Sequence, residues 1–102
     1  MKKEYIYAYI AGIFDGEGCV GIFGKKKKEH QLMIVSTDIN LIKFVQKEMN
    51  CGWITQHKTP LNKPHYKQRY DFRLAGRIKI KKFLMPLYPY LIIKKEIAKR
   101  FT

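Results

Sequence analysis

The sequence predicts an α+β fold in which four antiparallel strands form one sheet with helices packed against one of its faces. Apolar residues recur at helical spacing in four segments of the chain. Between them lie two pairs of segments in which apolar and polar residues alternate, as in half-buried strands. The order is therefore helix, strand, strand, helix, strand, strand, helix, helix (αββαββαα). The alternation favours an antiparallel sheet with one covered and one open face.

The first helix is expected over residues 3–14, and it is apolar nearly all round, so several of its sides should be buried. Ala8, Gly12 and Gly16 recur at i, i+4 and i+8, so on a helix they form one stripe with almost no side chain. Such a stripe lets the backbone of another helix approach closely. We expect Gly16 and Gly18 to end this helix.

Two acidic residues, Asp15 and Glu17, follow the stripe, and each is followed by a glycine. If two copies of this helix cross, each Glu17 comes close to its counterpart, and a close pair of carboxylates is a site for a divalent metal ion. For Asp15 a structural role is favoured, in which its carboxylate accepts backbone N–H groups around the turn.

The first strand pair is expected over 19–27 and 31–37, with a basic hairpin turn between the strands. Asp38 is the predicted N-cap of a helix that runs to about Asn50, and Gly52 should break this helix.

The second strand pair is expected over 53–58 and 68–74, with a connection that contains two prolines. A basic helix begins near Gly76, and after Pro86 and Pro89 a last helix runs to the end of the chain.

The open face of this sheet should carry polar and basic side chains, namely Lys25, Lys27, Thr55, His57, Arg69, Asp71 and Arg73. Arg69 and Arg73 have the fork that pairs with O6 and N7 of guanine. Asp71 either accepts a hydrogen bond from cytosine N4 or orients the two arginines. The alternative is an ordinary solvated sheet face.

Composition limits the kind of protein. The 102 residues fit one domain, 1–102, and 21 Lys and Arg against 8 Asp and Glu give a net charge of +13. Such a surplus predicts a polyanionic partner, with nucleic acid favoured over an anionic membrane. Apolar runs are too short for a membrane span, and the start lacks the core of a signal peptide, so we expect an intracellular protein. Cys19 and Cys51 should be free thiols.

Residues 10–18, Ile-Ala-Gly-Ile-Phe-Asp-Gly-Glu-Gly, resemble the LAGLIDADG motif of homing endonucleases. The motif occurs once, and single-motif members of that family act as homodimers. The resemblance therefore implies a LAGLIDADG homing endonuclease-like fold, with a curved sheet along the major groove of double-stranded DNA and no small-molecule substrate. The expected dimer interface comprises Ala8, Ala11, Gly12, Asp15 and Gly16.

The resemblance also implies catalytic residues. Glu17 matches the metal ligand, one from each subunit, although the motif's name has Asp there. The implied cofactor is Mg²⁺ or Mn²⁺, and Ca²⁺ would occupy the site without supporting cleavage. Lys94 looks like the lysine near the scissile phosphate, with Lys95 as the alternative. Ser36 and Thr37 lie where the family often has a water-positioning residue, but a turn or helix-cap role is favoured.

The sequence thus leaves three functions open. The first is a homing endonuclease that cuts a pseudo-palindromic site. The second is a DNA- or RNA-binding module of the same fold that does not cut, and the third is a monomeric basic structural protein.

Overall fold

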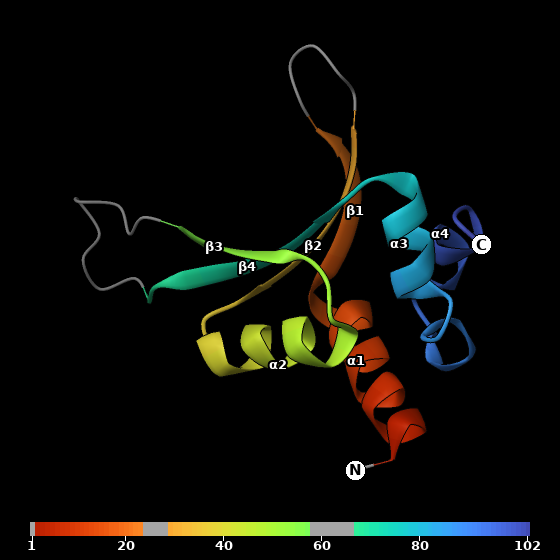
Figure 1. Cartoon of the computed structure of the whole chain (residues 1–102), viewed down its shortest axis with the longest axis horizontal. Coiled ribbons are helices and arrows are strands. Elements are labelled where there is room, and N and C mark those ends of the chain that lie inside the picture. The colour runs from red at the N-terminus through yellow and green to blue at the C-terminus, as the bar shows by residue number, and fades with distance from the viewer. Residues whose placement is uncertain (1, 24–28, 58–66) are drawn as a thin grey trace.

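The computed structural model describes residues 2–23, 29–57 and 67–102 (Figure 1). Its elements confirm the predicted α+β class and the predicted order of helices and strands. They are α1 (Lys3–Glu17), β1 (Gly18–Phe23), β2 (Glu29–Ser36), α2 (Ile39–Met49), β3 (Trp53–His57), β4 (Arg69–Ala75), α3 (Arg77–Leu84), the 3-10 turn η1 (Tyr88–Tyr90) and α4 (Lys95–Lys99). The expected last helix is short, because η1 and an irregular segment precede it.

Helix α1 continues through Gly16 to Glu17, so the expectation that it ends near residue 14 is wrong. Gly18 then enters β1 directly, and its backbone N–H donates to the carbonyl of Phe14. A Cβ atom at Gly18 would overlap the Phe14 ring and lie 2.7 Å from the Phe14 carbonyl oxygen. Only glycine therefore allows the strand to leave the helix this closely.

The N-terminus of α2 is capped as predicted. Asp38 Oδ1 accepts the backbone N–H of Asn40 at 2.9 Å, and Ser36 Oγ accepts the N–H of Asp38 at 3.0 Å. Ser36 therefore has the turn role favoured for it. At the other end, Asn50 adopts a left-handed conformation (φ 52°) and ends the helix before Gly52 (φ 82°) turns the chain into β3.

The strands form one antiparallel sheet in the order β1-β2-β4-β3, so the two hairpins meet through β2 and β4. Figure 1 shows α1 and α2 below the strands, with α3 and α4 together to the right of α1. The covered face contributes Leu32, Ile34, Phe72 and Leu74 to the core. The Phe72 ring stacks on the Phe83 ring of α3, with 5.5 Å between the two ring centres. The alternation read from β4 is therefore confirmed.

Two further expectations concern single features of the chain. In the described ranges, no helix combines the length and the apolar character that a membrane crossing requires. Cys19 and Cys51 are free thiols, as expected. Partial burial raises the pKa of the Cys51 thiol, although the charge of Lys79 opposes this effect.

Candidate functional site

Glu17 is the last residue of α1, and its side chain is exposed. Within the described part of the chain, no hydrogen bond or ion pair holds its carboxylate. The C-terminus of a helix carries a partial negative charge from its unpaired carbonyl groups. This helix end and the Glu17 carboxylate therefore both favour a cation at the same place.

Asp15 ties this end of α1 to a distant part of the chain. Its Oδ2 accepts the backbone N–H of Ile92 at 2.7 Å, and its Oδ1 accepts the N–H of Lys94 at 2.9 Å. The expected structural role is thus present, but its partners lie almost eighty residues away rather than in the adjacent turn. The carboxylate is occupied within its own chain instead of being offered to a second subunit.

The hydrogen bonds also set the protonation of Asp15. Partial burial by itself raises the pKa of this carboxyl group. The N–H groups of Ile92, Lys94 and Ile93, together with the Lys94 charge, outweigh burial and hold the pKa below its ordinary value. Asp15 therefore stays ionised at neutral pH.

The side chain of Lys94 lies at the same helix end. Its Nζ donates to the main-chain oxygen of Asp15 at 2.6 Å and lies 5.9 Å from the centre of the Phe14 ring. Helix α1 has no basic residue in its own last turn, so Lys94 supplies the cation that this helix end favours. Lys95 instead places its Nζ 5.2 Å from the centre of the Tyr88 ring. Of the two candidate lysines, Lys94 is the one that the fold brings to the end of α1.

The donor set of one chain fits part of a metal site. Among the residues that the structure describes, no group of three or more His, Cys, Asp or Glu side chains gathers around one point. Mg²⁺ commonly uses one or two protein carboxylates, and waters and phosphate oxygens complete its shell. A single exposed Glu17 per chain therefore fits a site shared with a second chain and with a phosphate.

The small-residue stripe of α1 is open. A Cβ atom added at Gly12 or Gly16 would meet nothing within 4 Å, and Ala8 is half-exposed. Tyr5 and Tyr9 are exposed nearer the start of the same helix. Ala11 is different, because it is fully buried in the core of its own chain. The assignment of Ala11 to a dimer interface is therefore wrong.

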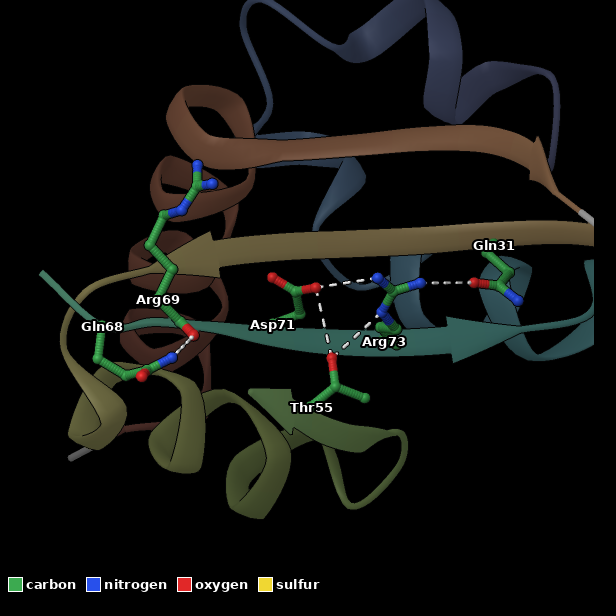
Figure 2. A network of polar contacts seen from close by, with 6 residues as sticks. All are labelled: Gln31, Thr55, Gln68, Arg69, Asp71 and Arg73. Atoms are coloured by element: carbon green, nitrogen blue, oxygen red, sulfur yellow. Dashed lines mark hydrogen bonds and ion pairs between the residues drawn. The ribbon is translucent and has the colours of Figure 1, made fainter. Parts of the chain in front are cut away.

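The open sheet face holds a polar network around Arg73 (Figure 2). Its Nη2 lies 3.0 Å from Asp71 Oδ2, its Nε donates to Thr55 Oγ1 at 3.3 Å and its Nη1 donates to Gln31 Oε1 at 3.4 Å. Thr55 Oγ1 in turn donates to Asp71 Oδ2 at 3.3 Å. Three side chains, one from each of β2, β3 and β4, thus hold one guanidinium group.

Asp71 is 0% exposed, so the expectation that it faces DNA directly is wrong. Its register neighbours Val35 and Thr55 flank it on the adjacent strands, and Arg73 lies beside it. The alternative role, orientation of arginine, is borne out for Arg73. Figure 2 shows the Arg69 side chain pointing away from this network.

The other residues predicted for the open sheet face are only partly within the described structure. Arg69 is exposed at the start of β4, and its carbonyl accepts from Gln68 Nε2 at 3.1 Å. Lys25, Lys27 and the side chain of His57 lie outside the described residues. Gln31 was not predicted as a site residue. The alternation along β2 could have placed it on the open face, because Leu32 and Ile34 of the same strand point into the core.

The comparisons with solved structures show what this architecture resembles. I-CvuI, a homing endonuclease crystallised with its target in the presence of Ca, superposes with a TM-score of 0.78 at 20% identity, over 95% of this chain and 63% of I-CvuI. The same enzyme with another target and Mg, its DNA not cleaved, gives 0.75 at 23% identity over 95% and 63%. The archaeal intron-encoded homing endonuclease I-Vdi141I, complexed with DNA, gives 0.78 at 16% identity over 98% and 66%.

The chain thus spans slightly less than two thirds of these structures. No curated protein sequence matches it. A family model described as a LAGLIDADG-like domain matches residues 4–102, almost the whole chain. The chain therefore belongs to the LAGLIDADG-like domain family and has the fold of the LAGLIDADG homing endonucleases.

Proposed function

We propose that this chain is one subunit of a homodimeric, divalent-metal-dependent endonuclease that binds double-stranded DNA at a pseudo-palindromic site and cuts both strands. One observation carries the proposal. The last turn of α1 carries an exposed acid, Glu17, and receives the ammonium group of Lys94 at the Asp15 carbonyl, beside a stripe whose glycines are open to a second helix. We further propose that the protein acts inside the cell, where its DNA lies.

The exposed surface around α1 supports dimerisation. Gly12 and Gly16 expose helix backbone, and the neighbouring Ile92 and Ile93 are 84% and 74% exposed. Asp15 holds these two isoleucines beside the end of α1. Apolar side chains this exposed on a chain of charge +13 favour contact with another protein surface. A second copy about a twofold axis would cover both features and bring the two Glu17 residues together.

The open sheet face and the net charge support DNA as the partner. Helices cover the other face, so the open one is free to follow a groove, and Arg69 and Arg73 lie on it. A charge of +13 favours the phosphate backbone of DNA and gives affinity without sequence information. Thr55, Lys25, Lys27 and His57 complete the proposed contact set.

Glu17 from each subunit, with phosphate oxygens and water, would hold the metal ion. Bound Mg²⁺ or Mn²⁺ would activate water and neutralise charge on the phosphate, whereas Ca²⁺ would fill the site without supporting cleavage. Lys94, fixed by the Asp15 carbonyl, would stabilise negative charge that develops on the scissile phosphate.

The test uses a duplex rebuilt from the DNA that flanks the gene, in its uninterrupted form. We expect the wild-type dimer to cut both strands with Mg²⁺, and Glu17→Gln to bind equally well but cut at least about 1000-fold more slowly. Lys94→Met should slow cleavage about 100-fold. Lys95→Met is the matched control and should cut like the wild type, because its side chain packs on Tyr88.

Three results would contradict the proposal. A Glu17→Gln variant that cuts normally removes the metal role of this acid. Tight binding without cleavage under any metal ion leaves a module that binds but does not cut. A protein that light scattering finds monomeric, with and without DNA, has no shared site.

A further inference from the structure

We infer that Arg73 is a specificity-determining residue that recognises guanine in the major groove, and that the buried Asp71 is the positioning residue that fixes it. This inference rests on the proposed binding of DNA to the open sheet face. It goes further by separating one arginine that selects a base from another that binds any sequence.

The hydrogen bonds of Arg73 leave a defined part of its guanidinium unused. A guanidinium group has five N–H donors in a planar fork. Within the described residues, Thr55 takes the Nε donor, Gln31 takes one donor of Nη1 and Asp71 takes one donor of Nη2. One N–H remains on each terminal nitrogen. The O6 and N7 atoms of guanine can each accept an N–H from an arginine, so each terminal nitrogen of Arg73 keeps a donor for one of them.

The surroundings hold this fork in place. Met33 and Trp53 are the register neighbours of Arg73 on the adjacent strands, so their side chains leave the sheet beside it on the same face. The side chain of Arg73 is nevertheless 27% exposed. It is therefore restrained laterally and accessible from the open face, and little rotamer freedom is left to lose when it binds.

Asp71 also changes what the charge of Arg73 can do. An arginine that is paired with a carboxylate 3.0 Å away adds little net attraction for phosphate. Arg73 should therefore determine which base is preferred rather than the total affinity for DNA. Arg69 is exposed at the start of the same strand, and the described residues hold no acid against its guanidinium. Arg69 should contribute affinity for every sequence.

The experiment starts from DNA duplexes that carry randomised positions and selects those that bind the wild-type dimer or one of three variants. Binding is carried out in Ca²⁺, so that the DNA is not cleaved. The wild type should select guanine at one position in each half-site. Arg73→Lys should lower that preference about tenfold or more, because ammonium lacks the fork. Asp71→Asn should weaken the preference at the same position without lowering affinity for mixed DNA. Arg69→Ala should weaken binding to all duplexes by one factor and leave base preference unchanged.

Gln31→Leu provides a second variant in case Asp71→Asn does not fold. It removes one hydrogen bond of Arg73 and leaves the buried Asp71 unchanged. It should weaken the preference for guanine at the same position, but less than Asp71→Asn does. A selection in which Arg73→Lys lowers binding to all duplexes equally overturns the inference alone. If the wild type binds no duplex, both the proposed DNA binding and this inference are wrong.

Discussion

The end of α1 and the centre of the open sheet face each contain an aspartate that fixes a cationic residue, but only one of the two regions is complete in a single chain. On the sheet, Asp71, Thr55 and Gln31 hold Arg73 in place from within the chain. At the end of α1, Asp15 fixes Lys94, while no described residue forms a hydrogen bond or ion pair with the Glu17 carboxylate. In the proposed dimer, each subunit would therefore read its own half-site, whereas the cutting site would need both.

The two aspartates also differ in how their partners are reached. Asp71 pairs with a residue two positions away on the same strand, which a strand places on the same face. Asp15 pairs with backbone groups 77 and 79 positions away, which only the packing of the 92–94 segment against α1 brings near. Substitutions at and near these two aspartates test the contrast.

Removal of Asp71 should have the largest effect on stability. Asp71→Ala leaves the part-buried guanidinium of Arg73 without its ionic partner, so we expect a loss of about 3 kcal/mol in the free energy of unfolding. Urea denaturation measures this loss. The double variant Asp71→Ala with Arg73→Met should recover a large part of it, since no unpaired charge remains. A loss below about 1 kcal/mol would mean that the network does not hold the sheet.

Asp15→Asn should cost less, about 1–2 kcal/mol at neutral pH, because it weakens charge-assisted hydrogen bonds at a partly exposed site. The folded-state pKa of Asp15 lies below its ordinary value. Its contribution to stability is therefore full above about pH 4 and is lost as the pH falls through the folded-state pKa. Denaturation of both proteins along this pH range measures the effect. A difference that stays constant or grows on acidification contradicts this assignment.

Gly12→Ala should have the smallest effect on the folded chain. A Cβ at this position meets nothing in its own chain, and alanine favours a helix, so the monomer should gain about 0.5–1 kcal/mol. The dimer should weaken, because the added methyl group separates the two helices. Thermal denaturation and sedimentation measure the two effects. Gly18→Ala is the contrast, since its Cβ overlaps Phe14 and should destabilise the chain itself. A dimer as tight as the wild type would place the interface elsewhere.

Much of the candidate site could be predicted from local patterns. The spacing of small residues and acids marked α1 and Glu17, and the alternation of β4 placed Arg69, Asp71 and Arg73 on one face. The burial of Ala11 could not be predicted in the same way. It lies next to the open Gly12, and only the direction in which α1 packs decides which of the two small residues faces the core.

Local patterns were enough to predict the order of helices and strands, the cap at Asp38 and the family motif, because each depends on residues a few positions apart. The basic character follows from composition alone. The tertiary structure decided the strand order β1-β2-β4-β3, the choice of Lys94 over Lys95 and the closure of the network around Arg73. These features join residues that are far apart in the chain. Their contacts form only after helices and hairpins have packed together, so no local period or spacing encodes them.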